Sequence, residues 1–194
     1  MISRLTLADL AVHGAHQKGH FRLSSGLHSS DYLQCALYLA NPVRAERAGQ
    51  ELAQSITATM VEPGAIVAPA IGGLIVGHET ARAFKVPFLF TERVDGKMAL
   101  RRGFGVDPKQ AIVVVEDVVT TGGSTNEVID LLEALGGCVI GVASLVNRSD
   151  SDNPFEPRPY VALLRASFPT WKANLCPLCR QGKPLVKPGS RPVK

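Results

Sequence analysis

Apolar runs alternate along the chain with segments in which apolar residues recur every three or four positions. The runs at 111–115 and 138–146 lack polar alternation, which is typical of strands covered by helices on both faces. The segment 126–135 spaces its apolar residues as one face of a helix does. This alternation predicts a doubly wound α/β fold, in which a mostly parallel sheet is flanked by helices.

Turn and capping residues divide the pattern into elements. Asn41 and Pro42 open a helix in the favoured way, with an N-cap followed by proline at the first helical position. A buried strand is expected at 87–91, and the strand at 160–164 is expected to be the last. The remaining expected elements are a strand at 65–69, helices at 6–12 and 74–84, and two extended segments within 21–33.

Length and composition favour one globular domain spanning residues 1–194. A chain of 194 residues is too short for two ordinary domains, and 45% hydrophobic with 20% charged residues excludes disorder over most of its length. No apolar run is long enough to span a membrane. The N-terminus carries an acid, Asp9, within its apolar part, so it does not read as a secretion signal, and the expected compartment is the cytoplasm.

A net charge of +4 and a pI near 9.0 permit nucleic-acid binding without favouring it. The basic residues are scattered, apart from Arg101, Arg102 and the tail. A solvated basic surface that attracts anionic substrates explains them better, so no nucleic-acid partner is expected.

The end of the run at 111–115 carries the most informative motif. Glu116 and Asp117 follow the strand, and Thr120–Ser124 then bring hydroxyls and two glycines to a turn that opens a helix. Unpaired N–H groups at a helix N-terminus bind anions, and carboxylates accept hydrogen bonds from sugar hydroxyls or hold a metal shell. The motif therefore predicts a sugar phosphate ligand. The alternative is an ordinary strand, turn and helix.

The residues from Val115 to Ser124 resemble the phosphoribosyl pyrophosphate (PRPP) loop of the type I phosphoribosyltransferases. The resemblance implies that the two acids bind the ribose hydroxyls near the positive charge that develops during reaction, while the turn anchors the 5′-phosphate. It also implies Mg²⁺ as cofactor, carried by PRPP and with no metal held by the protein itself. The implied PRPP-binding residues are Glu116, Asp117, Val118, Val119, Thr120, Thr121, Gly122, Gly123 and Ser124.

The segment 21–33 is similar to the N-terminal base-binding hood of orotate phosphoribosyltransferases, on its Leu-Ser-Ser-Gly turn and the tyrosine downstream. By this resemblance residues 1–40 form a hood in which Ser25, Gly26 and Tyr32 face orotate. Arg148, just past a strand end, would grip the orotate carboxylate, with Thr120 beside the base. From composition alone the turn reads as a plain hairpin loop, and Arg148 as a surface arginine.

Two positions depart from the family pattern. Many relatives carry lysines where this chain has Ser24 and Gly72. The positive charge that these lysines would bring to the substrates is therefore missing or supplied by other residues. In the family the turn at 71–73 approaches the pyrophosphate through its backbone. The same approach would suit this chain, the more so without a lysine.

The connection 92–108 carries four cations and three glycines. It resembles the flexible catalytic loop of orotate phosphoribosyltransferases, which implies a mobile lid that neutralises pyrophosphate in the neighbouring subunit of a homodimer. Arg93 and Lys97 are the implied catalytic cations, with Arg101 or Arg102 as further candidates. The alternative is a solvated basic hairpin.

The core is expected to span 41–165 and the C-terminal tail 166–194. In the tail, Cys176 and Cys179 look like half a zinc knuckle, and a similar Cys-Pro-x-Cys sequence ends some bacterial orotate phosphoribosyltransferases. A structural zinc needs four ligands, and Cys35 and Cys138 fall in predicted strands. Reduced thiols or a subunit contact are therefore favoured over a metal site.

Together these resemblances imply an enzyme that joins orotate to the ribose 5-phosphate of PRPP, forming orotidine 5′-monophosphate and pyrophosphate. A phosphoribosyltransferase for a purine or uracil is one alternative. A PRPP-sensing regulator that has lost catalysis is another, and it would bind nucleic acid with a steep dependence on salt.

Overall fold

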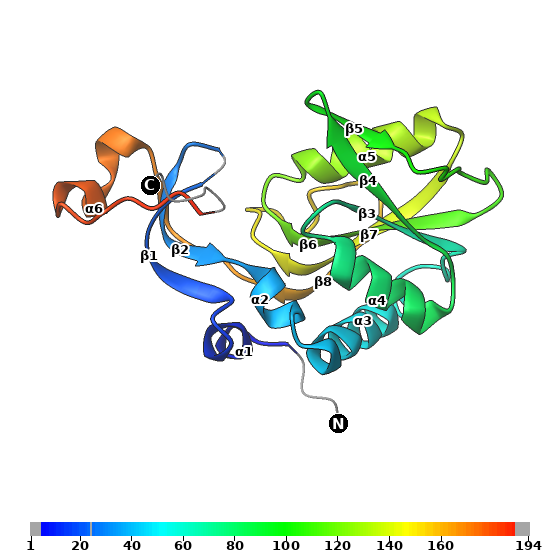
Figure 1. Ribbon diagram of the computed structural model, residues 1–194, viewed down its shortest axis with the longest axis horizontal. Coiled ribbons are helices and arrows are strands. Elements are labelled where there is room, and N and C mark those ends of the chain that lie inside the picture. Colours follow the sequence, from blue (N-terminus) through cyan, green and yellow to red (C-terminus); the bar gives the residue numbers. More distant parts are fainter. Residues whose placement is uncertain (1–4, 24, 189–194) are drawn as a thin grey trace.

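A computed structural model describes residues 5–23 and 25–188, and it shows a layered α/β core beside a smaller lobe (Figure 1). The core contains a six-stranded sheet in the order β5-β4-β3-β6-β7-β8. All neighbouring pairs are parallel except β4 with β5. The strands are β3 Ala65–Pro69, β4 Phe88–Val94, β5 Lys97–Leu100, β6 Ala111–Val119, β7 Cys138–Asn147 and β8 Tyr160–Arg165.

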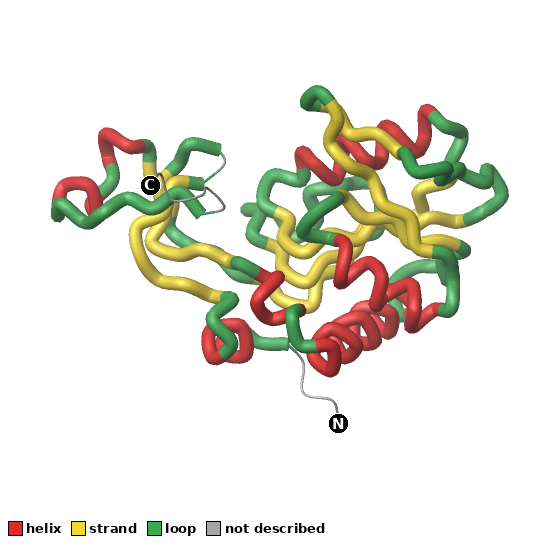
Figure 2. Tube along the Cα trace, viewed as in Figure 1, coloured by secondary structure: helices red, strands yellow, loops and turns green. Residues whose placement is uncertain are grey.

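Helices cover both faces of this sheet (Figure 2), as the apolar runs predicted. Helices α3 Pro42–Thr57 and α4 Leu74–Phe84 share one hydrophobic cluster with Val113 and Val115 of β6. Helix α5 Gly123–Ala134 packs in a second cluster with Ile112 and Val114. Successive side chains of a strand point to opposite faces, so β6 supplies both clusters and is buried on each side.

The lobe is built from the two ends of the chain. It comprises α1 Leu7–Val12, β1 His16–Arg22, β2 His28–Leu33 and α2 Cys35–Leu39, followed at the other end by β9 Thr170–Trp171, η1 Ala173–Leu175 and α6 Pro177–Arg180. β1 and β2 form an antiparallel hairpin, and β9 adds a third strand beside β2. Val186 then bridges back to Phe21 of β1. The C-terminal tail is thus part of the hood rather than an appendage of the core.

Four local expectations need correction. The strand at 160–164 is not the last, because β9 follows it, and a two-residue strand carries no periodicity to detect. β4 is mostly half-buried rather than buried, and it lies next to the edge strand of the sheet, where less of the core covers it. Part of the connection 92–108 is a hairpin with its turn at Asp95 and Gly96. Cys35 opens helix α2 rather than lying in a strand.

None of the helices in the described part of the chain is long and apolar enough to cross a membrane.

Candidate active site

Three strand ends and the hood supply the predicted site residues. Glu116 and Asp117 lie near the carboxyl end of β6, Arg148 directly follows β7, and Gly72 lies in the loop after β3. Because β3, β6 and β7 are parallel, their carboxyl ends lie at one edge of the sheet, where open α/β folds bind ligands.

The acidic pair is held close together and largely buried. Glu116 is 8% exposed, and its Oε1 accepts a hydrogen bond of 3.2 Å from the Asp117 amide. Asp117 Oδ1 accepts another, of 2.8 Å, from the Val118 amide. Burial, and then the nearby charge of Asp117, raise the pKa of Glu116 well above its ordinary value. Burial also raises the pKa of Asp117. Ligand hydroxyls that donate to these oxygens would stabilise the charged forms.

Gly72 lies directly against this pair. A Cβ at position 72 would fall 2.6 Å from Asp117 Oδ1, well inside van der Waals contact. Any side chain there therefore requires Asp117 or the loop to move. The absence of a side chain lets the loop backbone approach the acids.

The predicted phosphate loop opens α5 without a side-chain cap. Gly122 is the N-cap, with a left-handed φ of 76°, and it makes no side-chain cap. The Thr121 hydroxyl accepts a hydrogen bond from the Gly123 amide at 3.4 Å. Thr120, Thr121 and Ser124 are exposed, so their hydroxyls are accessible. The bond from Gly123 to Thr121 is long and therefore weak, so the N–H groups of this turn remain available to an anion. Val119 is 1% exposed, so only the main chain at that position can face a ligand.

Arg148 is fixed at its backbone, and its guanidinium contacts a ring but keeps one N–H unpaired within the described residues. Its amide donates to the Val119 carbonyl at 2.7 Å, and its guanidinium lies 4.9 Å from the ring centroid of Phe168. Its Nε is buried and has no hydrogen-bond partner among the described residues. Burial lowers the pKa of Arg148, while the charges of Asp31 and Tyr32 act in the opposite direction. A buried, unpaired guanidinium N–H is the donor that a planar anion would satisfy.

The structure brings the predicted hood residue Tyr32 to this edge. Burial raises the pKa of Tyr32, the charge of Asp117 adds to the effect, and the charge of Arg148 opposes it. Tyr32 therefore lies within electrostatic reach of both. Next to it, Asp31 Oδ1 pairs with His16 Nε2 at 2.7 Å.

Sequence reasoning missed the residues that support Arg148. His16 stacks on Phe168, with ring centroids 5.1 Å apart, so an aromatic pair backs the guanidinium. His16 and Phe168 come from opposite ends of the chain and belong to no shared motif. No sequence signal could have joined them.

Ser25 and Gly26 form the tip of the β1–β2 hairpin. Gly26 has a left-handed φ of 82° and open space where a Cβ would stand, and Ser25 is exposed. The only hydrogen bond described for the Ser25 hydroxyl is a weak one from the Leu27 amide, at 3.4 Å. No contact described in the structure joins this tip to Arg148. Ser24 lies outside the described residues.

The cations of the β4–β5 hairpin differ in their partners. Arg93 is bound to Glu127 of α5 at 2.9 Å, and Arg102 to Glu92 at 3.0 Å, with Arg101 farther from the same carboxylate at 3.9 Å. Lys97 is exposed and makes no ion pair within residues 5–23 and 25–188. Of the two implied catalytic cations, Lys97 is thus the one that is free to meet an incoming anion.

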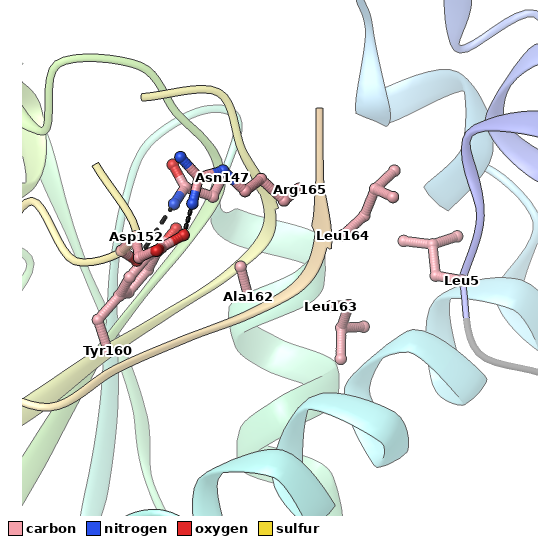
Figure 3. A pocket seen from close by; sticks show the side chains of 8 residues that line it. All are labelled: Leu5, Asn147, Asp152, Tyr160, Ala162, Leu163, Leu164 and Arg165. Atoms are coloured by element: carbon pink, nitrogen blue, oxygen red, sulfur yellow. Dashed lines mark hydrogen bonds and ion pairs between the residues drawn. The ribbon is translucent and has the colours of Figure 1, made fainter. Parts of the chain in front are cut away.

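A cavity of about 420 Å³ lies along β8, and it includes none of the residues assigned to PRPP or orotate (Figure 3). Leu163, Leu164 and Leu5 form its apolar side. Asn147 donates to the carbonyl of Asp152 at 3.4 Å. Arg165 also pairs with Asp152, and the Tyr160 hydroxyl bonds to Ser144. The polar groups of the cavity are therefore already engaged, so it offers little to a sugar phosphate.

Comparison with known proteins agrees with this geometry. Residues 38–171 match the model of the phosphoribosyl transferase domain. The orotate phosphoribosyltransferase of Carboxydothermus hydrogenoformans is 52% identical over 174 residues, covering 90% of this chain and 91% of that one. That of Thermotoga maritima is 47% identical over 181 residues, covering 93% and 95%.

Solved structures share the fold. The crystal structure of orotate phosphoribosyltransferase from Aeropyrum pernix is 26% identical, with a TM-score of 0.62 over 80% of this chain and 90% of that one. Leishmania donovani UMP synthase, at 20% identity, has a TM-score of 0.68 over 90% of this chain and 37% of its own length, which shows the fold alone. The chain belongs to the phosphoribosyltransferase family, and within it to the orotate phosphoribosyltransferases.

Proposed function

We propose that this enzyme transfers ribose 5-phosphate from PRPP to orotate, forming orotidine 5′-monophosphate and pyrophosphate, in de novo pyrimidine biosynthesis. The observation that carries the proposal is the buried, unpartnered Nε of Arg148 at the sheet edge where the acidic pair and the uncapped end of α5 also lie. A base that bears a carboxylate satisfies this arginine. Adenine and uracil carry no such group.

Each group then has a role in the displacement. The reacting ring N–H of orotate loses its proton to solvent, the nitrogen gives its electron pair to the anomeric carbon, and the pair of the broken C–O bond leaves with pyrophosphate. Glu116 and Asp117 accept hydrogen bonds from the ribose hydroxyls and stabilise the cation-like sugar. The N–H groups and hydroxyls of Thr120–Ser124 hold the 5′-phosphate, and Arg148 holds the orotate carboxylate with Thr120 beside the ring.

The donor set near PRPP fits Mg²⁺, which binds through one or two carboxylates together with substrate phosphates. Because the ion arrives on PRPP, Glu116 and Asp117 would hold it by way of the ribose hydroxyls whose hydrogen bonds they accept. When bound, the ion neutralises charge on the leaving pyrophosphate.

The β4–β5 hairpin supplies the remaining positive charge. We propose a cytoplasmic homodimer in which Lys97, helped by Arg93, reaches the pyrophosphate of the partner subunit. Arg93 would first release Glu127, an exposed pair whose loss costs about 1 kcal/mol or less.

Loss of orotate absorbance on adding PRPP and Mg²⁺ tests the reaction. Turnover with orotate and none with adenine or uracil supports the proposal. Turnover with adenine or uracil but not with orotate would assign a different base. RNA or DNA binding that weakens steeply with salt, without pyrophosphate release, would indicate a PRPP-sensing regulator instead of an enzyme.

A mixing experiment tests the hairpin and the dimer together. Lys97→Ala and Asp117→Asn subunits, each nearly inactive alone, should regain activity when mixed, because one site of the hybrid dimer keeps both residues. No recovery in hybrids verified by mass would show that the hairpin does not act on the partner.

A further inference from the structure

Four metal-ligating side chains meet in the hood lobe, outside the site described above. His20 lies in β1, His28 in β2, and Cys176 and Cys179 at the two ends of the first turn of α6. Their ligand atoms all lie within 4.8 Å of one another, and three of the four residues are buried. Cys176 is 0% exposed.

Four of the six distances between these ligand atoms are close to those of a tetrahedral site. His20 Nε2 lies 3.0 Å from His28 Nδ1 and 3.4 Å from Cys176 Sγ. Cys179 Sγ lies 3.3 Å from His28 Nδ1 and 3.7 Å from His20 Nε2. With Zn–N of about 2.0–2.1 Å and Zn–S of about 2.3 Å, tetrahedral geometry separates two nitrogens by ~3.3 Å and a nitrogen from a sulfur by ~3.5 Å. The observed separations agree within a few tenths of an ångström.

The protonation of His20 is set by a neighbour. Its Nδ1 lies 2.9 Å from the carbonyl oxygen of Lys183, and a carbonyl only accepts, so Nδ1 carries the proton. The Nε2 lone pair is then directed at the other three ligand atoms. A backbone carbonyl that orients the ring in this way is the usual support of a zinc-bound histidine.

We propose that His20, His28, Cys176 and Cys179 bind one structural zinc ion. Two thiolates and two imidazoles form a ligand set that favours zinc, and four protein ligands leave no open position for catalysis. The proposal goes beyond the enzyme's reaction and does not depend on it. It also replaces the expectation of inert thiols, because the half knuckle in the tail is completed by the β1–β2 hairpin.

The ion would fasten the C-terminal segment to the hairpin that carries Tyr32. It would add to links that already join them. β9 pairs with β2, Val186 bridges to β1, and three side-chain contacts join His20 to Lys183, Ser29 to Pro169 and His16 to Phe168. A small lobe with little core of its own gains stability from such a cross-link. Removing zinc should therefore loosen the hood while leaving the α/β core folded.

The direct test is the metal content of the full chain, purified without a histidine tag and under reducing conditions. Elemental analysis should find about one zinc per chain, and X-ray absorption should show two sulfur and two nitrogen ligands. The Cys179→Ser and His28→Ala variants should lose the metal. Cys138→Ser, which removes an exposed thiol outside the cluster, should keep it, as should Asp117→Asn.

A second measurement removes the dependence on variants that fold poorly. Wild-type protein stripped by a chelator should lower its melting temperature, regain it with added Zn²⁺, and with Co²⁺ show the visible bands of a tetrahedral thiolate site. Wild-type chain that arrives without metal and binds neither ion tightly would overturn the proposal. So would a Cys176–Cys179 disulfide in the active enzyme, or equal loss of zinc in Cys138→Ser.

Discussion

Replacing Arg148 with lysine tests the assignment of orotate specificity. The guanidinium offers two parallel N–H bonds to a carboxylate, whereas lysine offers one point charge. The buried Nε of Arg148 has no hydrogen-bond partner within the described residues, so its N–H remains available to a ligand. A hydrogen bond to a charged group contributes about 1.5–3 kcal/mol, which corresponds to about 10- to 150-fold in rate.

We therefore expect kcat/KM for orotate to fall about 10- to 150-fold in Arg148→Lys, with the KM for PRPP nearly unchanged. Steady-state kinetics with each substrate varied in turn measures both. Arg158→Lys is the matched control, because Arg158 pairs with Glu133 on the surface. Unchanged orotate kinetics, or equal losses for both substrates at an unaltered melting temperature, would refute the carboxylate role.

Three further predictions follow from the same edge of the sheet. In Gly72→Ala the new Cβ would lie 2.6 Å from Asp117 Oδ1, so Asp117 must move. A shift of about 1 Å in a catalytic group can cost ~10²-fold in rate, so kcat should fall by that order. Circular dichroism should show no loss of secondary structure. Lys97→Ala should reduce kcat, measured at saturating substrates, more than Arg93→Ala does, because Arg93 is held in an ion pair with Glu127. A larger loss in Arg93→Ala would contradict this prediction. Burial raises the pKa of Glu116, so the folded state binds its proton more tightly and stability falls as pH rises from the unfolded value through the raised one. Glu116→Gln removes the titrating group and with it this loss of stability. The melting temperature of the variant should therefore exceed the wild-type value by more at pH 8 than at pH 5. A difference that stays constant across pH would contradict the raised pKa of Glu116.

Local patterns in the sequence determined the core of this protein. The uninterrupted apolar run of β6 and the spacing of apolar residues in α5 depend only on neighbours along the chain, so strand, turn and helix were predicted in order. The same holds for α3, where the side chain of the N-cap Asn41 accepts a hydrogen bond of 3.1 Å from the Arg44 amide, as expected of an N-cap. Burial by helices on both faces follows from such patterns, and with it the position of the acidic pair at the sheet edge.

Only the tertiary structure decided which distant residues meet. The ring of Phe168 lies against Arg148, Glu127 of α5 engages Arg93, and two histidines of the hairpin join the two cysteines of the tail. These contacts join elements that are separate along the chain, and their residue types occur equally well on a solvated surface. Periodicity records which face of an element is buried but not what covers it, so the partners of the hood and tail emerge only when both ends of the chain pack together.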